Sequence, residues 1–211
     1  MAVGRLVTRE VGIEVAGREA TTAVAPFVLV AVLLAGLAFG PAPQILAAVA
    51  PGTIWLVTLL AAAPLARGVA AAEQDEGCWD LLRLLVSPTQ LLAGKLAAMW
   101  LHLLITWALT AALVAVVFPA PFPLAAIVAG PLGALGLAAV TVAFGTLLAA
   151  GRRRSGLLSV LLLPSGLPVL VAGTAVGLPG SAGMPWLALL VAYDVLMVVA
   201  TWAVFPVLLE E

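Results

Sequence analysis

Apolar residues run along this chain in six long stretches, and the segments between them carry most of its charged residues. A helix that crosses the hydrocarbon core of a bilayer, roughly 30 Å thick, needs about 20 consecutive apolar residues. All six stretches reach that length, and they are apolar on all sides, which favours helices over the alternating strands of a membrane barrel. The predicted spans cover residues 20–39, 45–66, 96–118, 124–150, 157–177 and 185–208.

Six spans place all nine basic residues on one side of the membrane. These residues precede the first span, lie between the second and third, or lie between the fourth and fifth. The other connections, residues 40–44, 119–123 and 178–184, are short, uncharged and rich in proline or glycine. Because Lys and Arg accumulate in short cytoplasmic loops, we predict that both termini are cytoplasmic. The first apolar run is too long for a cleaved signal peptide, so it is predicted to be a span.

The composition supports a single all-α, polytopic transmembrane domain over residues 1–211. Hydrophobic residues make up 64% of the chain and charged residues 9%, whereas soluble domains are about half apolar and a quarter charged. This excludes an ordinary soluble enzyme and a nucleic-acid binder. One cysteine, Cys78, excludes a disulfide within the chain.

Two cytoplasmic segments stand out by their pattern. Residues 1–19 mix apolar side chains with arginines, which predicts an amphipathic helix lying in the membrane interface, or else a plain helical extension. Arg152, Arg153 and Arg154 between the fourth and fifth spans would anchor the topology, or bind lipid headgroups or a partner.

The connection from Glu73 to Pro88 is the only long charged one. From Trp79 onward a helical period places Asp80 and Arg83 on one face and apolar side chains on the other, and Pro88 is expected to end the run. Such a helix needs an apolar surface: the inner leaflet, its own bundle, or the groove of a partner. The acidic residues at 73–76 argue against an anionic membrane and for a protein partner.

Polar groups inside the predicted spans are candidates for function. Asp194 lies near the middle of the sixth span, with Tyr193 beside it as a potential hydrogen-bond partner. His102, the single histidine, lies about two turns into the third span; it could contact haem, or hydrogen-bond a neighbouring helix.

Prolines and glycines in the spans predict bends and close packing. Pro164 and Pro168 flank Ser165–Gly166 in the fifth span and are expected to kink it. The two prolines are also candidates for a functional role inside the membrane. Gly133, Gly136 and Gly145 in the fourth span would let helices approach closely.

Motifs for chemistry are missing from the sequence. It contains no G-x-x-x-x-G-K-[ST] for ATP, no G-x-S-x-G and no H-E-x-x-H. We therefore predict no catalytic residue, no metal site and no cofactor bound by this chain.

Three stretches resemble the cytochrome c maturation protein B family (CcmB, the haem exporter membrane subunit). They are residues 40–55, residues 73–88, and residues 144–170, where Phe144–Leu148 leads through the arginine triplet to the prolines of the fifth span. The resemblance implies an ABC-2-like exporter bundle whose ATPase is a separate chain. It implies that residues 73–94 form the coupling region, with candidate contacts at Glu73, Gln74, Asp75, Gly77, Asp80, Leu81, Leu82, Arg83, Leu85 and Pro88.

The same resemblance implies partners, cofactors and location. The expected partners are an ABC ATPase subunit (CcmA-like), a haem-handling membrane protein (CcmC-like), a second copy of this chain, and indirectly a haem chaperone. ATP would bind the partner subunit and haem would be handled by the complex, in a bacterial inner (plasma) membrane. The alternatives are export of a lipid or other small hydrophobic substrate on the same architecture, and an intramembrane enzyme using Asp194.

Overall fold

A computed structural model describes residues 19–75, 87–150 and 161–210. Within these ranges the secondary structure is helical and contains no strand, which confirms the predicted all-α class. The elements are α2 (Glu19–Phe39), α3 (Pro43–Asp75), α5 (Pro88–Val117), α6 (Leu124–Ala150), α8 (Leu167–Gly177) and α9 (Gly183–Glu210).

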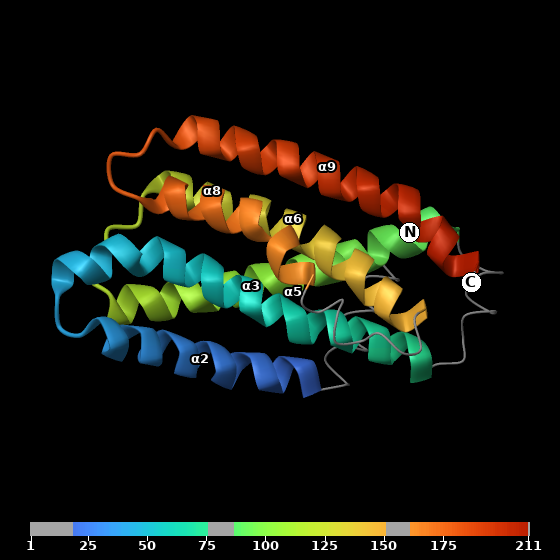
Figure 1. The fold of residues 1–211 in the computed structure, drawn as a ribbon, viewed down its shortest axis with the longest axis horizontal. Coiled ribbons are helices and arrows are strands. Elements are labelled where there is room, and N and C mark those ends of the chain that lie inside the picture. The colour runs from blue at the N-terminus through green and yellow to red at the C-terminus, as the bar shows by residue number, and fades with distance from the viewer. Residues whose placement is uncertain (1–18, 76–86, 151–160, 211) are drawn as a thin grey trace.

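The helices run back and forth along one axis, with α6 in the interior of the bundle (Figure 1). Helix α6 packs against α3, α5, α8 and α9, while α2 lies on the outside against α3 and α5. The connections 40–42, 118–123 and 178–182 gather at the left end in Figure 1, which we call the loop end. At two of them a glycine with positive φ, Gly40 at 67° and Gly180 at 76°, makes the turn.

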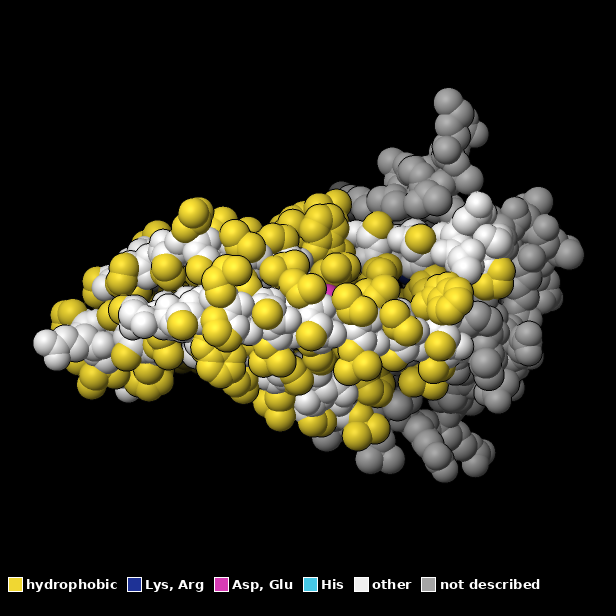
Figure 2. Space-filling view, turned by 90° about the horizontal axis from the view of Figure 1, so that it is seen from above, with side chains coloured by type: hydrophobic (Ala, Val, Ile, Leu, Met, Phe, Trp, Pro, Cys, Tyr) yellow, Lys and Arg dark blue, Asp and Glu magenta, His cyan; other side chains and the backbone are white. Residues whose placement is uncertain are grey.

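Four helices are long and apolar enough to cross a membrane: Pro43–Ala66, Pro88–Val117, Leu124–Leu147 and Gly183–Phe205. Two shorter apolar helices, Val24–Phe39 and Leu167–Gly177, lie alongside them. Hydrophobic side chains cover the described surface (Figure 2), among them Val116, Leu124 and Met184, each more than three-quarters exposed. A surface of this kind is stable in lipid, so the chain is a helical membrane protein.

The fourth predicted span has the same bounds as α6, whereas the third begins eight residues earlier than predicted, at Pro88. The helix predicted to stop before Pro88 lies outside the described residues up to position 86; Ser87 is not helical, and Pro88 opens α5. Ser87 caps this helix, its Oγ accepting a hydrogen bond from the Gln90 backbone N–H at 3.4 Å. Proline suits the first helical turn, where its missing N–H would have no partner in any case. Residues 88–94 of the predicted coupling region thus belong to α5.

The fifth predicted span is not one continuous helix in its described part. Residues 161–165 are helical, the chain turns at Gly166, and α8 begins at Leu167 with Pro168 in its first turn. Proline cannot donate a helical hydrogen bond and its ring crowds the preceding turn, so the helix is interrupted here. The predicted kink is therefore confirmed as a break, and α8 is a short helix of 11 residues.

Helix α6 reaches its neighbours through three glycines, and two of them were predicted to allow close packing. Gly130 receives the ring of Trp107 from α5, Gly133 receives Trp55 from α3, and Gly136 receives Tyr193 from α9. A Cβ atom at Gly130 would lie 2.5 Å from Trp107 Cη2, and one at Gly136 would lie 2.8 Å from Tyr193 Cδ1. The three aromatic rings thus occupy space that a side chain on α6 would fill.

The remaining predictions for the cytoplasmic side lie outside the described residues. These are the interfacial helix within residues 1–18 and the arginine triplet 152–154.

Replacing Gly133 by alanine is expected to destabilise the bundle. Its Cβ would overlap the ring of Trp55 and come within 2.8 Å of Val169 Cγ1, and both side chains are buried. Overpacking of this kind costs about 1–3 kcal/mol, more than the helix propensity gained from alanine. Thermal unfolding of the purified protein measures the change.

The matched control is Gly52→Ala in α3, where the new Cβ would lie 3.6 Å from Thr174 Cγ2, an ordinary contact. This variant should be as stable as the parent or more stable by up to about 1 kcal/mol. Equal effects of the two substitutions would contradict the packing described for α6.

Candidate functional site

The predicted coupling segment is described only at its two ends. Glu73, Gln74 and Asp75 form the last turn of α3, and Pro88 is at the start of α5. The six other candidates, Gly77, Asp80, Leu81, Leu82, Arg83 and Leu85, lie outside the described residues. Helix α3 continues nine residues beyond its apolar part, which ends at Ala66. At 1.5 Å per residue this extension is roughly 14 Å long.

Asp194 lies in a closed position at the interface of α9 and α6. The residue is 4% exposed, and neither carboxyl oxygen makes a hydrogen bond of ordinary geometry to a described residue. A Cβ atom at Gly136 would lie 2.5 Å from Asp194 Oδ1, so the carboxyl group packs directly on the backbone of α6. The absent side chain at Gly136 is what makes room for it.

Tyr193 does not hydrogen-bond Asp194, which corrects the pairing suggested by their adjacency in sequence. The Tyr193 hydroxyl donates to the backbone carbonyl of Ser165, the last helical residue before the turn at Gly166. Consecutive residues on a helix point in directions about 100° apart, so Tyr193 and Asp194 face different neighbours. Tyr193 thereby ties α9 to the break between Pro164 and Pro168.

Two further side chains hydrogen-bond across helices to carbonyl groups of α6. Trp100 Nε1 of α5 donates to the carbonyl of Pro131 at 2.9 Å, and Thr201 Oγ1 of α9 lies 3.2 Å from the carbonyl of Ala139. Hydrogen bonds between helices help hold membrane bundles together, because lipid tails compete poorly for polar groups. These contacts fix α5 and α9 along the length of α6.

His102 lies half-buried on α5, fourteen residues after Pro88 and thus about four turns into the helix, rather than two. Its backbone carbonyl accepts a hydrogen bond from Thr106 Oγ1 at 2.9 Å. Among the described residues, no three His, Cys, Asp or Glu side chains cluster in a way that could hold a metal ion. A contact between His102 and haem stays a prediction.

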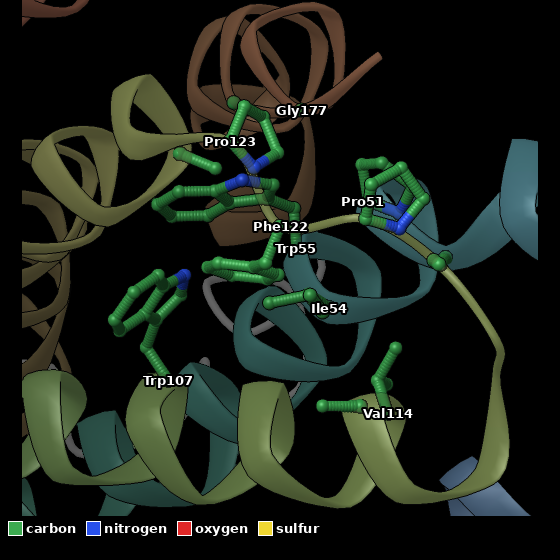
Figure 3. Close-up of a pocket in the computed structure, with 14 residues that line it drawn as sticks. Pro51, Ile54, Trp55, Trp107, Val114, Phe122, Pro123 and Gly177 are labelled. Atoms are coloured by element: carbon green, nitrogen blue, oxygen red, sulfur yellow. The ribbon is translucent and has the colours of Figure 1, made fainter. Parts of the chain in front are cut away.

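A cavity near the loop end is the feature that sequence reasoning missed (Figure 3). It is a small cavity of about 20 Å³, room for roughly one water molecule, and it is partly open to the surroundings. Trp107 lies between Trp55 and Phe122, with ring centroids 6.3 Å apart in both pairs. The full lining is Ala50, Pro51, Ile54, Trp55, Trp107, Val114, Ala115, Ala120, Pro121, Phe122, Pro123, Ala126, Gly173 and Gly177.

The lining of this cavity contains no charged side chain and no histidine. The buried indole N–H of Trp107 has no hydrogen-bond partner, and it is a polar group at the cavity wall. Such a lining offers no counter-charge to a carboxylate. The sequence gives no local signal for this cavity. Its walls come from four helices and a loop, and most of the lining residues belong to the apolar runs of the predicted spans.

The comparisons with known proteins agree on one family, and the matches cover most of the chain. The sequence model described as "CcmB protein" matches residues 1–208. Heme exporter protein B of Pseudomonas aeruginosa is 32% identical over 179 residues, which cover 79% of this chain and 80% of that protein. Heme exporter protein B of Rhodobacter capsulatus is 35% identical over 162 residues, covering 75% of this chain and 74% of the relative.

Removing the hydroxyl of Tyr193 is expected to loosen the contact between α9 and the break at Gly166. Tyr193→Phe keeps the ring against Gly136 but leaves the Ser165 carbonyl without this donor. The free energy of unfolding should fall by about 1 kcal/mol, measured by unfolding in detergent.

Thr58→Val is the matched control for this loss of a hydroxyl. Thr58 is fully buried, and its Oγ1 donates to the Ile54 carbonyl of its own helix at 2.8 Å. No link between helices is lost, so its effect should be close to zero. If Tyr193→Phe is equally silent, the bond to Ser165 does not stabilise the bundle.

Proposed function

Because this chain belongs to the CcmB protein family, we propose that it is the membrane (permease) subunit of an ABC transporter complex for cytochrome c maturation. The observation that carries the proposal is the family match over residues 1–208, together with the relatives that bear the name Heme exporter protein B. A protein of this family is a membrane subunit rather than an enzyme, and the ATPase of the complex resides in a partner chain.

In this proposal the segment 73–88 receives the force of ATP hydrolysis from the partner ATPase. Two structural features support this role. Helix α3 extends roughly 14 Å beyond its apolar part toward the segment, and α5 begins immediately after it with a capped first turn. Both helices pack against α6. A displacement at the segment would therefore shift two helices that contact the centre of the bundle, as in a shear or hinge motion.

The proposed orientation places the loop end outside the cell. All three connections there, residues 40–42, 118–123 and 178–182, lack Lys and Arg, while Arg67 lies in the last third of α3 and Lys95 near the start of α5, both away from the loop end. The rule that basic loops are cytoplasmic then gives N-in and C-in topology. The apolar helices α2 and α8 with its preceding turn would complete six spans in the inner membrane.

The work of the complex is proposed to be haem delivery, or release of a haem-loaded periplasmic chaperone. The proposed partners are the CcmA-like ATPase, the CcmC-like haem-handling protein and a second copy of this chain. The cavity near the loop end does not support passage of haem through this chain, because haem carries two carboxylates and the lining offers them no cation.

Export of a lipid or another small hydrophobic molecule is the second candidate. The uncharged lining that includes Trp55, Trp107 and Phe122 favours a neutral apolar group over an anionic one.

Mutating the coupling segment is expected to uncouple the complex. The triple variant Glu73→Ala, Asp75→Ala and Leu82→Ala removes two acidic groups and one residue of the predicted apolar face. Co-purification with the ATPase subunit and the ATPase rate should both fall, because the docking contact is weakened. Unchanged association and unchanged rate would show that this segment does not couple the two subunits.

The control for the coupling experiment is Gln44→Ala. Gln44 is an exposed polar residue on the same helix, α3, but at the loop end. Its replacement should leave both association and ATPase rate unchanged.

Deleting the gene distinguishes the two candidate functions. If the chain serves cytochrome c maturation, a deletion strain should lose covalently bound haem c, assayed by haem staining of membrane and periplasmic proteins. Expression of the parent chain should restore it. Normal levels of haem c in the deletion strain would instead favour export of a hydrophobic substrate.

A further inference from the structure

Asp194 lies in the middle of the apolar part of α9. It lies eleven residues after Gly183 and eleven before Phe205, the ends of the apolar part of α9. At 1.5 Å per residue its Cα is roughly 16 Å from either end, in a hydrocarbon layer about 30 Å thick. The carboxyl group is therefore as far from water on both sides as this helix allows.

Within the part of the chain that the structure describes, neither carboxyl oxygen of Asp194 has a hydrogen-bond partner of ordinary geometry. The two elements that pack most closely on α9 are α6 and α8, and neither contains a titratable residue within Leu124–Ala150 or Leu167–Gly177. On α9 itself the neighbouring Tyr193 hydroxyl is committed to the Ser165 carbonyl. Helix α5 is the third helix that contacts α9, and its ionisable residues are Lys95 and His102. Neither of them hydrogen-bonds the carboxyl oxygens of Asp194.

A carboxylate in this position would be a buried, unpaired charge, which is the most unfavourable state for an ionisable side chain. A metal cation does not resolve the problem, because hard cations require six or more oxygen ligands and the site presents only the two oxygens of one carboxyl group. A proton removes the charge, and the neutral carboxylic acid costs far less to bury than the carboxylate.

We propose that Asp194 is a proton-binding site at the centre of the membrane, and that the bound proton holds α9 against Gly136 of α6. The ligand is a proton, and the site is the carboxyl group seated on the backbone of α6 where a Cβ atom would lie 2.5 Å from Oδ1. This inference concerns residues of α6 and α9 and does not depend on the proposed role in an ABC complex.

Loss of the proton has a structural consequence at the neighbouring residue. The carboxylate would have to draw in water or a cation, and on the side of α6 the contact with Gly136 would have to open to admit either. Helix α9 would therefore separate from α6 and carry Tyr193 away from Ser165, releasing the break at Gly166. The proton on Asp194 thus controls whether Tyr193 of α9 stays hydrogen-bonded to Ser165 at the break before α8.

Infrared difference spectroscopy of the chain in lipid nanodiscs tests the proposal directly. Subtracting the spectrum of Asp194→Asn from that of the parent should leave the carbonyl stretch of a neutral carboxylic acid. This substitution is neutral and nearly isosteric, so the fold is expected to be retained. If the difference shows the paired bands of a carboxylate at neutral pH, the proposal is wrong.

Two further measurements separate proton binding from a merely structural role. The thermal midpoint of the parent should fall as the pH rises, because the folded state favours the protonated acid, and the midpoint of Asp194→Asn should not follow it.

The second measurement is chemical labelling with dicyclohexylcarbodiimide. This reagent adds across the O–H of a neutral carboxylic acid, and acyl transfer to nitrogen then gives a stable N-acylurea with no atom lost.

Peptide mass analysis should find this adduct at Asp194 and not in the Asn variant. Above the titration range the yield should fall about tenfold per pH unit, as the protonated fraction does. A parent protein whose midpoint is as independent of pH as that of Asp194→Asn would overturn the proposal.

Discussion

Because glycine has no side chain, Gly130, Gly133 and Gly136 determine how closely the other helices can approach α6. In lipid there is little hydrophobic force between helices, so association depends on packing and on hydrogen bonds between them. Each glycine accepts a large group from a different helix, namely Trp107 of α5, Trp55 of α3, and Tyr193 with Asp194 of α9. Because the three sites follow one another at intervals of three residues, they turn around α6 and distribute its neighbours.

The same arrangement brings the functional candidates into mechanical contact. Helices α3 and α5 flank the predicted coupling segment at one end, and their rings Trp55 and Trp107 line the cavity nearer the other end. Tyr193 connects α9 to the break before α8, and Gly166 at that break packs on Leu59 of α3. In the proposed coupling, a movement of α3 would reach the cavity and the break through these packed side chains. In a close-packed interior such contacts shift as units rather than deform continuously.

Buried polar residues in this bundle fall into two groups. The hydroxyls of Thr58, Thr110 and Thr141 donate to carbonyls of their own helix, four residues back, and so need nothing from a neighbour. The Tyr193 hydroxyl instead bonds another helix, and Thr201 Oγ1 lies within reach of carbonyls of both its own helix and α6. Asp194 has no such bond, and among the described residues it is the buried carboxyl group without a hydrogen-bond partner. This contrast directs attention to its protonation rather than to a partner.

The sequence alone determined that most of the chain lies in lipid, that it is helical, and approximately where its apolar helices lie. The length of an apolar run is a property of each segment by itself and needs no tertiary contact. The sequence located α6 fully, and the family resemblance rested on contiguous stretches such as residues 40–55. It also predicted close packing at Gly133 and Gly136 and a kink at Pro164 and Pro168, which follow from local backbone chemistry.

Other features depended on what a residue meets across the bundle, and these only the tertiary structure decided. Adjacent residues Tyr193 and Asp194 were expected to pair, yet the helix points them at different neighbours. The third span was predicted to begin at residue 96, whereas α5 begins at Pro88 with Ser87 as its cap. The cavity around Trp107 draws its walls from residues 50 to 177, and no local pattern in an apolar sequence tells a ring that faces a cavity from one that faces lipid.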